Sequence, residues 1–360
     1  MNTPAMNTPA MNPAAMNSLA MNAPAQALST RSLPVIAIAV GDPAGIGPEI
    51  ALKAALSPET LALCRPVLVG DRGVIETHAR LCGITAPLVS VQRTRDAVPA
   101  GAVALLERQQ LPPGQLQLGQ IQAAHGLSAI DSARAAVQAG LDGAVDAVIS
   151  APQTEAAIHA AGIDFDGYPT FVARCAGIAP EDAFLMICYD RDGVEVRILH
   201  VTLHVSLRRA IELVTRERVA KAIGVAHDTL RRIGIDQPRI AVSGLNPHAG
   251  EGGLFGSEES EIVLPAMADA RARGILVEGP WGADTMFAKP GFDAYVVMFH
   301  DQGHIVAKTE ARNRSAGLSL GSPVLFSSVA HGSALDIAGK NQASPAAIIA
   351  AVRRLAATRV

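Results

Sequence analysis

Short apolar runs recur along the chain from Pro34 onward, and polar or glycine-rich segments separate them. Six of these runs are rich in β-branched residues, which predicts strands. They span residues 34–40, 66–70, 144–150, 196–203, 239–245 and 293–300. Alanine-rich segments such as 128–143 lie between several of the runs and predict helices. Continuous apolar strands that alternate with helices indicate an α/β fold with mainly parallel sheets covered on both faces.

The length of 360 residues predicts two domains or one two-lobed unit, because a single core rarely serves so long a chain. The pattern of apolar runs along the chain has a break near residue 150, which suggests a boundary between lobes. We expect one lobe from 32–150 together with 307–360, and a second lobe from 151–306. Residues 1–31 consist largely of imperfect five-residue repeats that begin with Met-Asn, and their few apolar residues predict a disordered tail.

Composition and charge narrow the classes of function. Hydrophobic residues make up 49% of the chain, so it can bury a large core, and the net charge of -3 leaves no general basic surface. We therefore expect no nucleic-acid partner. No run reaches the ~18 to 20 apolar residues that cross a bilayer, so we expect no membrane span. The four cysteines lie far apart without a paired motif, which predicts reduced thiols in a cytoplasmic protein.

The segment GDPAGIGPE, residues 41–49, follows the first predicted strand directly. Its glycines permit a tight turn, and the free amides at the start of the following helix attract anions. The spacing is not that of a dinucleotide-binding GxGxxG loop. A ligand-binding loop and a plain connection between strand and helix therefore both remain open.

Three histidines, His204, His248 and His300, each follow or end an apolar run. Side chains at strand ends converge at the open edge of an α/β sheet, where ligands bind. Three imidazoles leave one coordination position open, which suits a catalytic divalent metal, zinc first and Mg, Mn, Co or Fe as alternatives. Asp301 could orient one of these ligands or join the ligand shell of the metal. Lys308 could hold a carboxylate or relay a proton, although a solvated surface lysine fits the same position.

The segment HGSALDIAG, residues 331–339, resembles the loop that holds the adenosine half of the dinucleotide in the isopropylmalate and isocitrate dehydrogenase superfamily. The resemblance implies that His331 faces adenine and that Asp336 binds the ribose, which favours NAD over NADP. The rest of the cofactor-binding set that it implies is Gly332, Ser333, Ala334 and Asn341.

Five motifs, GDPAGIGPE, NPHAGEGG, GADTMF, HDQG and HGSALDIAG, occur in the order found in the 4-hydroxythreonine-4-phosphate dehydrogenase family, and the chain resembles that family from about Val35 to its last helix. The resemblance implies a two-lobed α/β/α fold like that of isocitrate and isopropylmalate dehydrogenases, with a cleft between the lobes. It also implies a homodimer with its active site at the subunit interface, and a divalent metal held by His204, His248 and His300.

The departures from that family concern the substrate. The vitamin B6 enzyme has a Gly-His-Thr motif where this chain has Gly-Tyr168-Pro169, and its substrate asparagine and arginine are replaced by Gly317 and Phe326, while Lys308 is kept. These features are similar to the terephthalate cis-dihydrodiol dehydrogenase branch of the family. Tyr168 and Phe326 would line a flat, ring-shaped pocket, although ordinary packing also accounts for them.

The predicted reaction is a metal-dependent, NAD-linked oxidative decarboxylation of a β-hydroxy acid, in which terephthalate cis-dihydrodiol becomes protocatechuate, carbon dioxide and NADH. Lys308 and Asp301 are the candidates for proton handling, and Lys308 could instead clamp a carboxylate. Two alternatives remain open. One is 4-hydroxythreonine-4-phosphate dehydrogenase or another hydroxy-acid (phosphate) dehydrogenase, and the other is a non-catalytic relative that binds metal or ligand.

Overall fold

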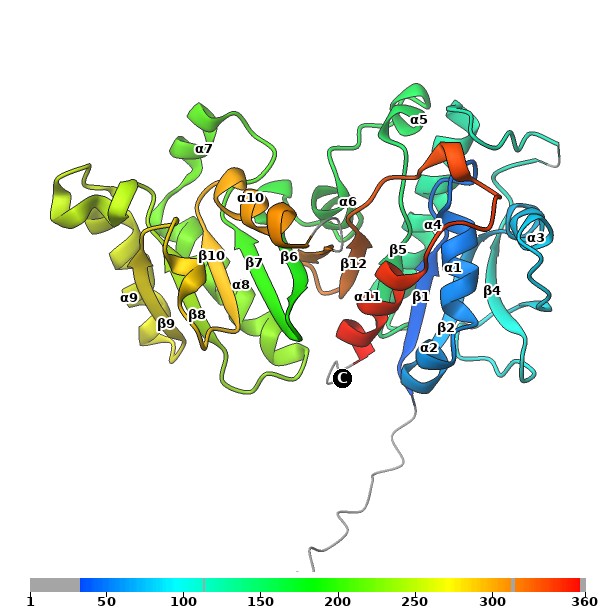
Figure 1. Ribbon diagram of the computed structural model, residues 1–360, viewed down its shortest axis with the longest axis horizontal. Helices are drawn as coiled ribbons and strands as arrows, with labels where there is room; N and C mark the ends of the chain where they lie inside the picture. The colour runs from blue at the N-terminus through cyan, green and yellow to red at the C-terminus, as the bar shows by residue number, and fades with distance from the viewer. Residues whose placement is uncertain (1–32, 113, 312–314, 357–360) are drawn as a thin grey trace, which may run out of the picture. The chain divides into compact units, whose positions relative to one another are not determined.

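The computed structural model describes residues 33–356 except 113 and 312–314, and these described residues form one compact unit (Figure 1). The predicted repeat tail, 1–31, lies outside the described residues. None of the helices in the described part of the chain is long and apolar enough to cross a membrane.

The described residues form a single sheet of twelve strands in the order β3-β4-β2-β1-β5-β12-β11-β6-β7-β10-β8-β9. Eight of its eleven strand pairings are parallel, and β11 with β12, β11 with β6 and β6 with β7 are antiparallel. The strands are β1 (Val35–Ala39), β2 (Arg65–Asp71), β3 (Leu88–Ser90), β4 (Val103–Arg108), β5 (Ala147–Ser150), β6 (Phe184–Arg191), β7 (Val194–His200), β8 (Arg239–Ser243), β9 (Leu276–Trp281), β10 (Ala294–Val297), β11 (Ala316–Leu320) and β12 (Phe326–Val329).

Helices cover both faces of this sheet (Figure 1). In β1, Ile36 and Ile38 pack in one apolar cluster with residues of α1 and α11, whereas Ala37 and Ala39 pack in a second cluster with α4. Burial on both faces explains why the predicted strands are continuously apolar. The helices are α1 (Gly47–Ala55), α2 (Pro58–Leu63), α3 (Arg72–Leu81), α4 (Ala123–Leu141), α5 (Glu155–Ala160), α6 (Tyr168–Cys175), α7 (Leu207–Leu213), α8 (Arg216–Arg232), α9 (Leu264–Ala272), α10 (His300–Ala311) and α11 (Ala346–Ala356).

The α/β fold class with a mostly parallel sheet is confirmed, and all six predicted runs contain strands, but four of these strands, β1, β7, β8 and β10, end earlier than predicted. The last run was expected to be extended as far as His300, whereas β10 ends at Val297 and His300 is the first residue of α10. The side chain of Gln302 explains this, because its Oε1 accepts the backbone N–H groups of Met298 and Phe299 at 2.8 and 3.1 Å. A side chain that takes these donors ends the strand and starts the helix.

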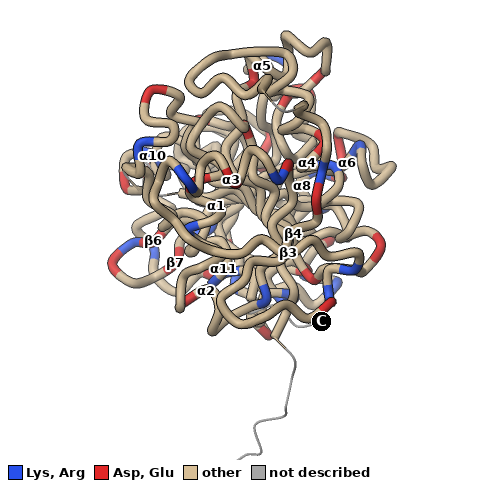
Figure 2. The backbone as a smooth tube through the Cα atoms, turned by 90° about the vertical axis from the view of Figure 1, so that its right-hand side faces the viewer, with Lys and Arg blue, Asp and Glu red and all other residues tan. Residues whose placement is uncertain are grey.

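The predicted division into two lobes stays a prediction. Helix α10 runs across the proposed boundary at residue 306, and Ile158 of α5 and Phe171 of α6 share an apolar cluster with α4. Lysines and arginines are interspersed with acidic residues on the side of the chain that Figure 2 shows.

Candidate active site

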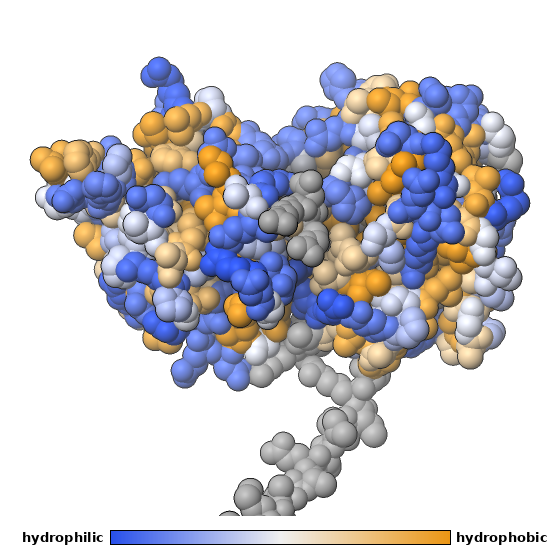
Figure 3. Space-filling model, viewed as in Figure 1, coloured by the Kyte–Doolittle hydropathy of each residue, from blue (hydrophilic) through white to orange (hydrophobic). Residues whose placement is uncertain are grey.

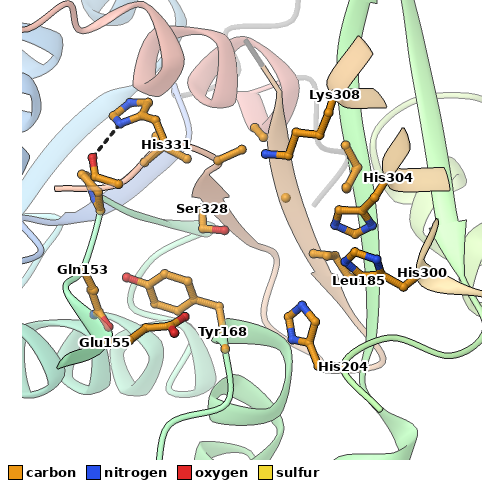
Figure 4. A pocket seen from close by; sticks show the side chains of 18 of the residues that line it. Gln153, Glu155, Tyr168, Leu185, His204, His300, His304, Lys308, Ser328 and His331 are labelled. Atoms are coloured by element: carbon orange, nitrogen blue, oxygen red, sulfur yellow. Dashed lines mark hydrogen bonds between the residues drawn. The ribbon is translucent and has the colours of Figure 1, made fainter. Parts of the chain in front are cut away.

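A cavity of about 730 Å³ opens beside the central strands β6, β11 and β12, and side chains from α6, α10 and the loops after β5, β7 and β12 line it (Figure 4). The sheet order explains why these segments are neighbours, because β12 and β11 lie between β5 and β6. The cavity brings together eight of the residues predicted for the site, namely Tyr168, His204, His300, Asp301, Lys308, Gly317, His331 and Gly332.

His204 and His300 point toward the same part of the cavity, and their ring centroids lie 5.8 Å apart (Figure 4). The Nδ1 atom of His300 lies 2.6 Å from Asp301 Oδ1, and that of His204 lies 3.3 Å from the backbone oxygen of Asp166. Each ring is therefore held through Nδ1 and keeps Nε2 for a ligand. This is how metal-binding histidines are usually oriented, with a carboxylate or carbonyl behind the ligating ring.

Two further histidines lie behind this pair. His304 stacks on His300 with centroids 3.7 Å apart and an angle of 12° between the rings, and its Nδ1 lies 3.1 Å from His200 Nε2. Burial, assisted by His304, lowers the pKa of His200 to about 3, and burial, assisted by His300, lowers the pKa of His304 to about 4. Both rings are therefore neutral near pH 7. The Nδ1–H of His200 then donates to the backbone oxygen of Leu185 at 3.3 Å, which leaves His200 Nε2 to accept from His304.

His248 does not line this cavity in the single chain, and its role as a metal ligand beside His204 and His300 stays a prediction. It lies in the loop after β8, where residues 248–252 all have positive φ angles, and its exposed side chain contacts Glu251 Oε2 at 3.1 Å. The buried carboxylate of Glu259 holds this loop by accepting the backbone N–H groups of Leu245 and Asn246, each at 2.7 Å. Within the part of the chain that the structure describes, no three metal-ligating side chains form a group that could hold an ion. The orientation of His204 and His300 thus fits a metal, and the third predicted ligand, His248, lies outside this cavity.

Lys308 lies on α10, eight residues after His300, and its amine points into the cavity (Figure 4). Glu310 anchors the end of this helix, because it accepts from the Tyr189 hydroxyl at 2.6 Å and from Arg191 Nε at 2.7 Å. Asp301 is mostly exposed and contacts the His300 ring. Asp301 therefore orients the His300 ring, and the amine of Lys308 is available to a substrate.

Tyr168 contributes its ring to the cavity wall. Its hydroxyl bonds to Ser150 Oγ and donates to the backbone oxygen of Ala151 at 3.1 Å, which turns the polar end away from the histidines (Figure 4). Burial raises the pKa of Tyr168, so this phenol stays protonated. Phe326 was expected to line the pocket, but it is fully buried with its centroid 4.9 Å from that of Tyr168, and it supports the wall from behind. Pro169 is likewise buried in the first turn of α6 and does not line the cavity.

Gly317 lies in the middle of the sheet, paired with Ile187 of β6 and Ser328 of β12. A Cβ atom at this position would lie 3.0 Å from Leu185 Cδ1 and 3.2 Å from Ser328 Oγ, closer than side chains normally pack. Leu185 and Ser328 thus occupy the space that a side chain at 317 would need. The absence of a side chain leaves the backbone of β11 as a flat floor to the cavity.

Several cavity residues were missed from the sequence. Gln153 and Glu155 follow the predicted strand 144–150, so the rule that ligands bind at strand ends could have found them. Ser328 lies in a short strand that carries two serines and lacks an apolar run. His200, which contacts His304 and does not itself line the cavity, lies inside an apolar run. Nothing in their local sequence distinguishes these two residues.

Comparison with known proteins agrees with this geometry. The family model described as pyridoxal phosphate biosynthetic protein PdxA matches residues 62–355. The chain belongs to the PdxA family. It is 42% identical to 1,2-dihydroxy-3,5-cyclohexadiene-1,4-dicarboxylate dehydrogenase of Comamonas sp over 324 residues, which cover 89% of this chain and 97% of that protein. It is 39% identical to D-threonate 4-phosphate dehydrogenase of Cupriavidus necator, over 89% of this chain and 96% of the relative.

Solved structures of PdxA relatives have the same fold. A 4-hydroxythreonine-4-phosphate dehydrogenase from Burkholderia phymatum superposes with a TM-score of 0.79 at 33% identity, covering 92% of this chain and 100% of the other. A terephthalate 1,2-cis-dihydrodiol dehydrogenase from Burkholderia xenovorans has a TM-score of 0.70 at 39% identity, covering 91% and 100%. The TM-score compares backbones that the PdxA family shares, so pocket side chains are the better guide to substrate. This PdxA-family chain is therefore a dehydrogenase by relationship.

The predicted dinucleotide loop of this PdxA-family chain begins at the cavity and runs away from it. His331 and Gly332 line the cavity, whereas Ser333, Ala334, Asp336 and Asn341 do not. The Ser333 side chain is buried, and its Oγ accepts from Thr154 Oγ1 at 2.9 Å. Their assignment to NAD stays a prediction.

Proposed function

We propose that this chain is a metal-dependent, NAD-linked dehydrogenase that oxidises and decarboxylates terephthalate cis-dihydrodiol to protocatechuate. One observation carries the choice of substrate: the cavity has a flat floor at Gly317 and an aromatic wall at Tyr168, next to the histidine pair. A ring-shaped diol fits such a surface better than an open-chain phosphate ester does. The 42% identity to the dehydrogenase of Comamonas sp supports the same choice.

The substrate contains a secondary alcohol β to a carboxylate. Oxidation removes a hydride and a proton from this alcohol, and the resulting β-keto acid loses carbon dioxide to leave an aromatic catechol. When bound, a divalent ion at His204 and His300 supplies Lewis-acid polarisation of oxygen atoms, and NAD accepts the hydride. The free Nε2 atoms of these two histidines are the donors that suit zinc or a related ion.

Three residues of the chain bind and orient the substrate and the metal ligands. Lys308 projects toward the cavity and either clamps a substrate carboxylate or moves the alcohol proton. Asp301 holds the His300 ring, and its bond to Nδ1 keeps Nε2 directed at the cavity. Tyr168 packs against the substrate ring, because its hydroxyl is already bonded to Ser150 and Ala151.

We further propose that His248 serves the cavity of a second copy of the chain, so that a homodimer completes each metal site. His248 stands on a loop whose neighbours Leu254 and Phe255 are exposed, at 72% and 45%. Exposed apolar residues also lie on and before α7, namely Val205, Leu207 and Ile211. Apolar surface is visible over these two regions, at the far left and upper left of Figure 3. Apolar patches of this kind are typical of subunit interfaces.

A second candidate is the oxidation of D-threonate 4-phosphate, which the 39% identity to the enzyme of Cupriavidus necator favours. The two candidate substrates share the β-hydroxy acid unit. They differ in the group at their other end, which is a ring carboxylate in the diol and a phosphate in D-threonate 4-phosphate. The lining residues in the described ranges include Lys308 and no arginine. Arginine binds phosphate with two parallel hydrogen bonds, and the described lining of this cavity offers none of that kind.

The test compares NADH formation with three substrates: the diol, D-threonate 4-phosphate and 4-hydroxythreonine 4-phosphate. Each reaction is run with zinc-reconstituted and with chelator-treated protein. We expect kcat/KM to be highest for the diol and turnover to vanish without metal. Preference for either phosphate ester would overturn the proposed substrate and keep the dehydrogenase, whereas NADH formation that persists after chelation would overturn the metal site.

A further inference from the structure

We infer that Glu49 is a positioning residue that holds the cofactor loop, residues 331–343, in its binding conformation. The inference rests on the proposed function, because it takes that loop as the NAD site. Glu49 belongs to the GDPAGIGPE segment, for which the sequence left a ligand loop and a plain connection both open. The structure assigns this segment a third role, which is to hold in place the loop proposed to bind NAD.

The distal end of the loop is tied to α1 through Glu49. Its side chain is fully buried, and Oε1 accepts the backbone N–H of Ala343 at 3.0 Å and the amine of Lys53 at 2.6 Å. Lys53 also donates to the backbone oxygen of Ala343 at 2.9 Å. One buried ion pair thus satisfies both backbone groups of a residue 294 positions away in the chain. Charge-assisted bonds to a backbone fix position more firmly than neutral ones do.

The proximal end of the loop rests on the same segment. The backbone N–H of Ile46 donates to the Ser333 oxygen at 2.8 Å. A Cβ atom on Gly45 would lie 2.6 Å from that oxygen, so only glycine allows the two backbones to approach this closely. The first helical amides, which the sequence offered as an anion site, are therefore engaged in part by the loop itself.

The segment also fastens the other side of the cavity. Asp42 is buried, its backbone N–H donates to the Pro152 oxygen at 2.9 Å, and Gly41 packs against that same oxygen. Pro152 lines the cavity next to Gln153. Loss of the Glu49 carboxylate should therefore loosen the loop from 331 to 343 and leave unaffected the pair His204 and His300, which lie in the loop after β7 and on α10.

The experiment measures NADH affinity by fluorescence and zinc affinity by competition with a chromophoric chelator, for the zinc-reconstituted full chain and three variants. Glu49→Gln removes the charge at the distal end, and Gly45→Ala pushes on Ser333 at the proximal end, so one variant remains if the other fails to fold. Asp131→Asn is the matched control, because it breaks the ion pair with Arg108, at 2.6 Å, without touching the loop. Free energies of unfolding are measured for all four proteins.

We expect Glu49→Gln, which loses one charge-assisted bond, to raise the NADH dissociation constant and the KM for NAD on the order of tenfold. Gly45→Ala should raise both in the same direction, because it displaces the Ser333 backbone. Zinc affinity should stay at the wild-type value, and Asp131→Asn should bind NADH normally. If wild type binds NADH and both loop variants bind it with the same affinity, the positioning role is overturned and the proposed cofactor is not. A parallel loss of zinc affinity would overturn it too, since it would indicate general unfolding. A wild-type chain that fails to bind NADH would overturn both this role and the proposed cofactor.

Discussion

The rings of His300 and His304 stack face to face, with centroids 3.7 Å apart and an angle of 12° between them. His304 is in turn held by His200 through a 3.1 Å contact between ring nitrogens. Since His200 is buried on β7 and the other two lie on α10, the stack fixes the first turn of that helix against the sheet. The ring plane of His300, and hence the direction of its Nε2, depends on this support.

Replacing the supporting ring should therefore weaken metal binding without removing a ligand. We expect His304→Ala to lower zinc affinity by about 10- to 100-fold, which is the usual effect of losing a group that orients a ligand. His304→Phe keeps a stacking ring and should lose less. Competition with a chromophoric chelator measures both. Equal affinities in wild type and His304→Ala would show that His300 needs no support from this ring.

Substrate selection should respond to the floor of the cavity. Gly317→Ala places a methyl group 3.0 Å from Leu185 Cδ1, so we expect kcat/KM for the diol to fall by about tenfold or more as the ring is displaced. Leu185→Ala in the same chain should restore part of the activity, because it gives back the space. Gly73→Ala is the matched control, since a Cβ there meets no atom within 4 Å. An active Gly317→Ala single variant would refute the flat-floor account of specificity.

Sharing of the metal site between subunits predicts a result for mixed variants. His204→Ala removes a ligand from the cavity, and His248→Ala removes the ligand proposed to reach the neighbouring cavity, so each homodimer should be inactive. Refolding the two together gives heterodimers in which one of the two sites has all its ligands. Random mixing should then restore about a quarter of wild-type activity, because half of the dimers carry one intact site. A mixture no more active than its parents would place all ligands of a site in one chain.

Stability should depend on pH through His78. Burial lowers the pKa of this fully buried histidine, and its contact with the Pro43 oxygen, at 2.9 Å, opposes the shift only in part. The unfolded chain therefore binds more protons than the folded chain below the free histidine pKa of about 6.5, and the free energy of unfolding falls as pH drops through that value.

Urea denaturation at about pH 7.5 and about pH 5.5, on either side of the free histidine pKa, measures this effect. His78→Gln keeps a donor for Pro43 and does not titrate, so it should lose less stability than wild type between the two values. His200, His227 and His304, whose pKa values burial also lowers, are present in both proteins and cancel in the comparison. Identical losses in both proteins would mean that His78 does not contribute.

The sequence predicted the parts of the fold that depend on local apolar pattern. Strands such as β1 are buried on both faces and read as continuous apolar runs, whereas β11 and β12 mix serine and glycine with apolar residues and gave no such run. The strand that leads to His300 was predicted too long, because Gln302 captures two backbone donors from a position beyond the run. A side chain that caps a helix from its third residue is hard to distinguish from a polar loop residue in sequence.

The sequence predicted which residue types belong to the site, but not where each side chain points. His204, His300 and Lys308 line one cavity, whereas His248 lies on a loop in which six consecutive residues, 248–253, have positive φ angles, including Ala249 and Glu251. Non-glycine residues rarely adopt that conformation, and Glu259 fixes the residues just before it by accepting the backbone N–H groups of Leu245 and Asn246. The packing of Phe326 behind Tyr168 is likewise a tertiary relationship that no spacing indicates.

The stoichiometry of products tests the central claim most directly. Purified, zinc-reconstituted protein is incubated with a limiting amount of terephthalate cis-dihydrodiol and excess NAD, and NADH, protocatechuate and carbon dioxide are quantified together. The account predicts equal amounts of all three, and none after chelation or in His300→Ala. NADH without protocatechuate would contradict the decarboxylation, and no reaction from a protein that binds both zinc and NADH would contradict the substrate.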